Sequence, residues 1–299
     1  MRYLINAEFR RPKPQAPTRP AMPYAAHLRR DLAQRNLRWA HEQAYLHEAS
    51  LGSVPAVLYR EDEQGRHGNF LSESYLAIKQ NPAWARRLGK VHTSARRTLL
   101  SRDADRRELD SSNSSDALLM NIFCHPSTLV LPRLSTLLGV EADAPVTFGY
   151  RPRVPLQNGR KDATEIDMQI GDLLVEAKLT ESDFQCAPRR LIERYRDLEE
   201  VFDLDNLEIV EDTIYSYQLL RGVLAAHGSE NDRFCVLCDA RRPDLIAAWH
   251  RVQTAVRPYD LRCRLQLLTW QELAAALSNE LQMFLKVKYG IDSQSPANR

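Results

Sequence analysis

The spacing of apolar residues changes along the chain, from mostly helical in the first part to a mixture of strands and helices in the second. Residues 24–51 place apolar side chains at helical spacing among many charges, which predicts a helix. Shorter helices are expected over residues 71–80, 82–88, 116–123 and 129–138. Farther along, alternating apolar and polar positions predict strands, and helices separate some of them. The expected strands are residues 146–154, 164–170, 173–179, 234–239 and 261–268, and the expected helices are 188–202, 212–227, 243–256, 270–277 and one ending near 288.

This order of elements predicts an α/β fold in which helices flank a mixed central β-sheet. Four segments are expected: a Pro-rich basic arm over residues 1–23, a mostly helical region over 24–110, a core over 111–289 and a polar tail over 290–299. A strongly polar stretch near residue 110 ends in good N-cap residues before an apolar helix, which favours a boundary there.

Composition excludes several classes of protein. The 299 residues are 43% hydrophobic and 27% charged, which allows a sizeable core and excludes a largely disordered chain. No apolar run is long enough to predict a membrane span or a signal peptide, so we expect a cytoplasmic protein. Five cysteines in a chain of this length argue against a disulfide framework.

The net charge of +2 is too small for a protein that binds nucleic acid through bulk charge alone. Arginine greatly outnumbers lysine, and arginine suits bidentate phosphate contacts, although genomic base composition can produce the same bias. The chain has no glycine-rich phosphate or dinucleotide motif and no Gly-x-Ser-x-Gly. Composition therefore permits nucleic-acid binding without indicating it.

One segment places two acids and a lysine on adjoining strands. A two-residue Gly-Asp turn joins the expected strands 164–170 and 173–179, which predicts an antiparallel hairpin. Side chains alternate between the two faces of a strand. The polar faces of the hairpin can therefore bring Asp167, Glu176 and Lys178 together.

A cation best explains why two carboxylates would stand together, because like charges at short distance repel each other. Mg²⁺ favours one or two carboxylates with water and phosphate oxygens, and the backbone carbonyl of Ala177 can add another oxygen. Lys178 beside the ion could orient or deprotonate a water molecule, or stabilise charge on a phosphate. We therefore expect a Mg²⁺ site, open also to Mn²⁺, at Asp167, Glu176 and Ala177 that can hydrolyse a phosphodiester.

A simpler interpretation makes Glu176 and Lys178 a structural ion pair between neighbouring side chains of an ordinary α/β protein. Three features favour the metal site. None of the other lysines follows an acid at this spacing, the apolar run 173–175 is typical of a central strand, and Asp167 lies on the adjoining strand.

The segment resembles the motif of the PD-(D/E)xK nuclease superfamily, whose fold many restriction endonucleases share. The resemblance assigns Asp167 as the first acid, Glu176 as the second and Lys178 as the lysine. Ile166 stands where the motif usually has proline. A later helix with Tyr and Gln resembles one found in several branches of the superfamily, which makes Gln218 an auxiliary candidate.

Weaker matches occur in order along residues 55–275 and resemble bacterial proteins that are classed as restriction-endonuclease-like. They include Arg66-His67-Gly68-Asn69-Phe70, Asn81-Pro82-Ala83-Trp84, His92-Thr93-Ser94-Ala95-Arg96 and Asn121-Ile122-Phe123. A further acid often comes from the first core helix of the superfamily, and Asp116 and Glu165 are rival candidates for it. His67 and His92 could contact substrate or be structural.

The resemblance implies a restriction-endonuclease-like fold and a metal-dependent nuclease that acts on DNA. A homodimer would supply the two active sites that cutting both strands of a duplex requires. The alternative is a protein of the same fold that binds nucleic acid without cutting it.

Overall fold

The computed structural model describes residues 23–50, 54–91 and 107–293. The basic arm expected over 1–23 lies outside these residues except for its last position, as do His92 and most of the expected tail. The domain boundaries proposed from the sequence remain predictions.

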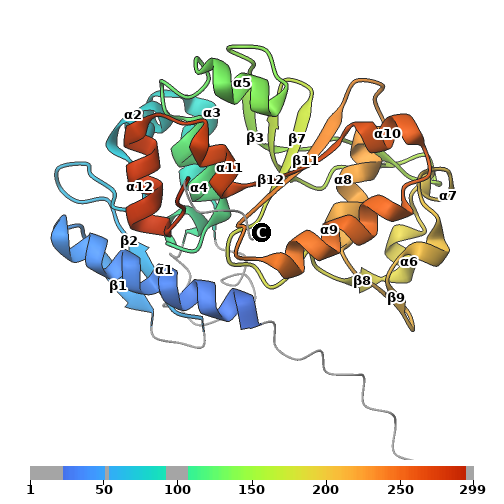
Figure 1. The fold of residues 1–299 in the computed structure, drawn as a ribbon, viewed down its shortest axis with the longest axis horizontal. Helices are drawn as coiled ribbons and strands as arrows, with labels where there is room; N and C mark the ends of the chain where they lie inside the picture. The colour runs from blue at the N-terminus through green and yellow to red at the C-terminus, as the bar shows by residue number, and fades with distance from the viewer. Residues whose placement is uncertain (1–22, 51–53, 92–106, 294–299) are drawn as a thin grey trace, which may run out of the picture.

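The centre of the molecule is a five-stranded mixed sheet in the order β12-β11-β7-β6-β3 (Figure 1). Strands β3, β6 and β7 form an antiparallel meander, whereas β7, β11 and β12 run parallel to one another. Their bounds are β3 Val146–Tyr150, β6 Ile166–Ile170, β7 Leu173–Ala177, β11 Arg233–Cys238 and β12 Leu265–Thr269. The α/β fold with a mixed central sheet is therefore confirmed.

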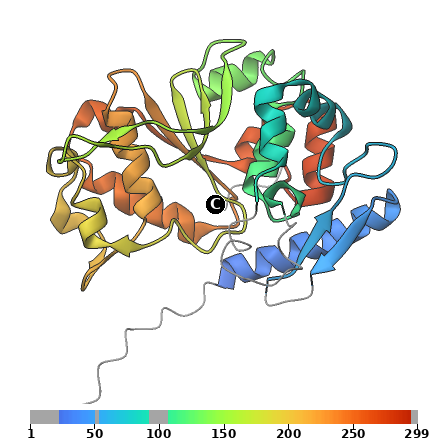
Figure 2. The same ribbon diagram turned by 180° about the vertical axis from the view of Figure 1, so that it is seen from behind.

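Helices cover both faces of this sheet, as Figures 1 and 2 show from opposite sides. Against one face lie α4 (Ser115–Phe123), α5 (Pro132–Leu138), α11 (Trp270–Ala275) and α12 (Asn279–Tyr289). Against the other lie α6 (Arg189–Ile192), α7 (Leu198–Val201), α8 (Tyr217–His227), α9 (Pro243–Ala255) and α10 (Tyr259–Cys263). Every residue of β7 is buried, because this strand lies in the middle of the sheet with apolar layers on both sides.

The N-terminal elements pack beside the first layer. Helix α1 (Pro23–Glu42) contacts α12, and the hairpin of β1 (His47–Ser50) and β2 (Ala56–Tyr59) packs against α1. Helices α2 (Ser72–Gln80) and α3 (Pro82–Leu88) lie next to α4 and β3, respectively. Among the described helices, none combines the length and the apolarity that crossing a membrane requires.

Short elements complete the described part of the chain. The remaining strands are β4 Val154–Pro155, β5 Lys161–Asp162, β8 Ala187–Pro188, β9 Ile209–Val210 and β10 Thr213–Ile214. Two 3₁₀ turns occur at Glu108–Asp110 and Leu204–Asn206.

Several predicted boundaries were wrong where tertiary pairing overrides local spacing. The helix expected over 24–51 ends at Glu42, and residues 47–50 instead pair with β2. The strand expected over 261–268 begins only at Leu265, because Tyr259–Cys263 forms a short helix after Pro258. The helix expected over 188–202 is two separate turns, and that expected over 212–227 begins only at Tyr217, after β10. In addition, α5 begins at Pro132.

Candidate active site

The hairpin of β6 and β7 sets the candidate residues opposite one another. Gly171 takes the left-handed conformation (φ +57°) at the turn, where a side chain would be strained. The register pairs Met168 with Val175 and Gln169 with Leu174, so that Asp167 lies across from Glu176. In β6 the apolar residues are buried and the polar residues are half-buried, as the alternating pattern predicts.

Glu176 and Lys178 are unusual because both charged side chains are almost completely enclosed, with 2% and 4% of their surface exposed. Lys178 Nζ lies 2.5 Å from Glu176 Oε1 and donates a hydrogen bond to it. Asp167 Oδ2 accepts a hydrogen bond of 2.8 Å from the backbone N–H of Ala177. The structure therefore brings Asp167, Glu176, Ala177 and Lys178 together at one end of β7.

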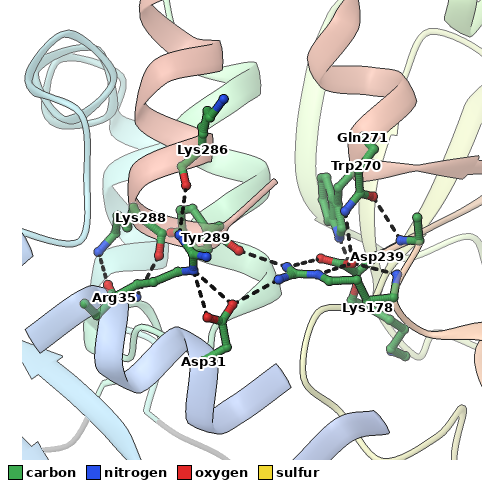
Figure 3. A network of polar contacts seen from close by, with 12 residues as sticks. Asp31, Arg35, Lys178, Asp239, Trp270, Gln271, Lys286, Lys288 and Tyr289 are labelled. Carbon is green, nitrogen blue, oxygen red and sulfur yellow. Dashed lines mark hydrogen bonds and ion pairs between the residues drawn. The ribbon is translucent and has the colours of Figure 1, made fainter. Parts of the chain in front are cut away.

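The backbone of Lys178 is held from two sides. Its N–H donates to the carbonyl of Leu237 at 2.8 Å, which extends the pairing of β7 with β11. Its carbonyl accepts a 2.9 Å hydrogen bond from the indole of Trp270 (Figure 3). These contacts hold the backbone of Lys178 in place, and its buried ammonium group donates to Glu176.

The charges of this group are strongly coupled. Burial raises the pKa of Asp167 well above its ordinary value, and the nearby charges of Glu176 and Asp116 raise it further. Burial alone would lower the pKa of Lys178, but Glu176 and Asp167 raise it above its ordinary value, so the lysine stays protonated. Two carboxyl groups stand beside one ammonium group, so a further cation could be balanced there.

A second cluster of charges lies beside the first. Arg87, at the end of α3, bridges Asp116 and Glu165 with two contacts of 2.6 Å. Lys90 lies 3.0 Å from the same carboxylate of Asp116, 3.3 Å from Glu165 and 3.1 Å from Glu108. The two rival candidates for a further acid therefore lie together, and cations from the N-terminal part of the chain neutralise both.

A comparison of the sequence with known families found a match. A sequence model of the family described as "Restriction Endonuclease associating with ARP" matches residues 39–290. The chain belongs to this family. No curated protein and no solved structure matched. The restriction-endonuclease-like family predicted from the sequence is confirmed, and this family suggests nuclease activity.

In this family member, Gln218 lies in the first turn of α8, and its backbone N–H donates to the carbonyl of Phe184. The Phe184 ring in turn lies 5.8 Å from Lys178 Nζ. The side-chain oxygen of Gln218 is buried without a hydrogen-bond partner in the described part of the chain. Phe184 therefore links Gln218 to the group, and the auxiliary role of Gln218 stays a prediction.

Arg87 and Lys90 lie beside the candidate site, and neither was assigned a role there from the sequence, although Arg87 belongs to the stretches that resemble the family. Arg87 lies in a short helix, and the residues around it do not indicate that its partners are acids far along the chain. His67 is buried, and its Nε2 lies 3.3 Å from Asp110 Oδ1, within the N-terminal elements. This contact favours the structural role that the sequence left open for it.

Proposed function

We propose that this protein is a metal-dependent nuclease that hydrolyses phosphodiester bonds, with DNA as its substrate. The observation that carries the proposal is the group formed by the buried Glu176 and Lys178 with the half-buried Asp167 opposite them. A carboxylate pair and an ammonium group, enclosed at the end of a central strand, are costly to bury unless they have a function or an excellent partner.

The donor set fits a hard divalent cation. Asp167 and Glu176 offer carboxylate oxygens, and Ala177 lies between Glu176 and Lys178 on the same strand end. Burial and then the nearby charge of Glu176 raise the pKa of Asp167, and a bound cation would favour its ionised form. Mg²⁺ or Mn²⁺ held by Asp167, Glu176 and the Ala177 carbonyl would supply Lewis-acid stabilisation of a phosphate and an activated water.

The chain's own residues would do the rest. Lys178 is protonated, and its ammonium group would donate hydrogen bonds to phosphate oxygens and stabilise their growing charge. The backbone contacts of Lys178 with Leu237 and Trp270 would keep the group in place during the reaction. Gln218 would serve as an auxiliary group through its unpartnered amide oxygen.

DNA is the proposed substrate because the family description names a restriction endonuclease. Cutting a duplex breaks one phosphodiester bond in each strand, so a homodimer would place one active site on each strand.

The test is cleavage of supercoiled plasmid, linear duplex and single-stranded DNA with Mg²⁺ or Mn²⁺. Wild type should cut at least one substrate, and Lys178→Ala should lose cutting while it stays folded and still binds DNA. Lys286→Ala, which changes an exposed lysine of α12, is the matched control and should cut like wild type. Equal cutting by wild type and Lys178→Ala would contradict the proposal. DNA binding by wild type without any cutting would favour the non-cutting alternative.

A further inference from the structure

Three helix ends meet on the face of the molecule formed by α2, α4 and α12 (Figure 1). Glu73 lies in the first turn of α2, Glu280 in the first turn of α12, and His125 just beyond the end of α4. One potential ligand atom from each of these residues lies within 4.8 Å of the other two. These residues are far apart in the sequence, so only the packing of the helices brings them together.

The histidine is the decisive member of this group. His125 has only 7% of its surface exposed, and its Nε2 atom is buried without a hydrogen-bond partner in the described part of the chain. This atom lies 3.5 Å from Glu280 Oε2, within the range of an ion pair. Its other ring nitrogen, Nδ1, accepts a 3.3 Å hydrogen bond from the Ser127 backbone N–H and lies 2.9 Å from the Ser127 hydroxyl.

Helix dipoles explain the two glutamates but leave the histidine unexplained. A carboxylate in the first turn of a helix is stabilised by the positive end of the dipole, whether or not a ligand is present. A buried imidazole nitrogen normally finds a hydrogen bond, and one that lacks it needs a reason. The 3.5 Å ion pair with Glu280 is longer than a normal hydrogen bond, and a cation between His125 Nε2 and the two carboxylates would satisfy all three groups.

We propose that Glu73, His125 and Glu280 form a binding site for a borderline divalent transition metal such as Zn²⁺. One imidazole nitrogen and two carboxylate oxygens are a ligand set that Zn²⁺ accepts, with water completing a tetrahedron. At ligand distances of about 2.0–2.1 Å, neighbouring ligands of a tetrahedron stand about 3.3 Å apart, close to the separation of Nε2 and Oε2. Both glutamates are exposed, so each can rotate to close the remaining distance.

The surroundings of His125 suit such a site. In the metal-bound form Nδ1 would carry the proton and donate it to the hydroxyl of Ser127, and this contact would replace the 3.3 Å hydrogen bond that Nδ1 accepts from the Ser127 backbone N–H. The bound ion would hold α2 and α12 against the end of α4. The first turn of α4 contains Asp116. The inference is independent of the proposed nuclease activity, because the imidazole ligand favours a different class of ion from the oxygen-only group at β7.

Zn²⁺ titration of the metal-free full chain tests the proposal, with calorimetry for stoichiometry and a thermal melt for stability. Excess Mg²⁺ and the Asp167→Asn background exclude binding at the end of β7. We expect one equivalent of Zn²⁺ to bind and to raise the melting temperature. Co²⁺ in its place should give the intense visible absorption of a tetrahedral N/O site.

His125→Gln and Glu280→Gln should each weaken Zn²⁺ binding by at least about tenfold and abolish the rise in melting temperature. The matched control is His227→Gln, because His227 faces Glu200 at 3.6 Å in a similar His–Glu pair. This control should bind Zn²⁺ like wild type. Failure of wild type to bind Zn²⁺, or equally tight binding by the His125 variant, would overturn the proposal.

Discussion

Lys178 and Lys288 are both enclosed by the protein, yet their surroundings give them opposite properties. Lys178 lies at the end of β7 beside two carboxylates, and its pKa is raised. Lys288 lies where α12 packs on α1, donates a hydrogen bond to the amide oxygen of Asn36 and stands 4.1 Å from the centre of the Tyr59 ring. Burial lowers its pKa well below the ordinary value. Figure 3 shows both lysines within one polar neighbourhood.

The difference shows that burial alone does not decide whether a lysine is charged, because the neighbouring groups matter as well. The Glu176 carboxylate, 2.5 Å away, keeps Lys178 protonated. In the proposed reaction the ammonium group of Lys178 would contact a phosphate. Among the described residues, Lys288 Nζ contacts a neutral amide and the rings of Tyr59 and Tyr289 and no carboxylate, so its amine is favoured in the uncharged form. One buried lysine suits chemistry on an anion, and the other fills the junction of two helices.

The largest effect on stability is expected when the ion pair of Lys178 with Glu176 is broken by substitution. Lys178→Met should lower the free energy of unfolding by about 3–5 kcal/mol, because it leaves the buried Glu176 without its partner. The double variant Glu176→Gln/Lys178→Met should recover most of that loss. Urea unfolding of the three proteins measures both changes. A single variant as stable as wild type would show that the pair is not coupled.

A smaller effect is expected from the anchor of the Lys178 backbone. Trp270→Phe removes the indole N–H that donates to the Lys178 carbonyl and leaves a small cavity in a fully buried position. The cost should be about 1–3 kcal/mol in urea unfolding. DNA cleavage should also slow, because the lysine would lose a fixed starting point. Unchanged cleavage in a destabilised variant would limit Trp270 to a packing role.

The smallest effect should come from Lys288, and it should depend on pH. The folded pKa of Lys288 is lowered, so the unfolded chain binds the extra proton and wild type gains stability as pH rises toward the unfolded pKa of about 10.4. Lys288→Met should therefore stabilise the protein at pH 7, and this gain should shrink by pH 9.5. Urea unfolding at both pH values measures this.

Lys286→Met is the control for that experiment, since Lys286 lies on the same helix with a largely exposed side chain. Its effect should stay within about 0.5 kcal/mol at both pH values. A gain in Lys288→Met that is constant with pH would mean that Lys288 is charged in the folded protein.

Local pattern was enough to predict the hairpin and its acids. The turn, the alternation in β6 and the apolar run in β7 all lie within 16 residues, so Asp167, Glu176 and Lys178 could be placed together before the structure. Arg87 and Lys90 could not, because their partnership with Asp116 and Glu165 depends on how α3 docks. The same limit applies to His125, which meets Glu73 and Glu280 only after three helices pack.

The most direct test of the central claim is plasmid cleavage by Asp167→Asn beside wild type in Mg²⁺. Asparagine keeps an oxygen that can accept the Ala177 N–H, and it removes a charge that burial already disfavours, so the variant should fold. The account predicts that wild type cuts and that the variant has no metal-dependent cutting. Cutting by Asp167→Asn at the wild-type rate, with the same dependence on Mg²⁺, would contradict it.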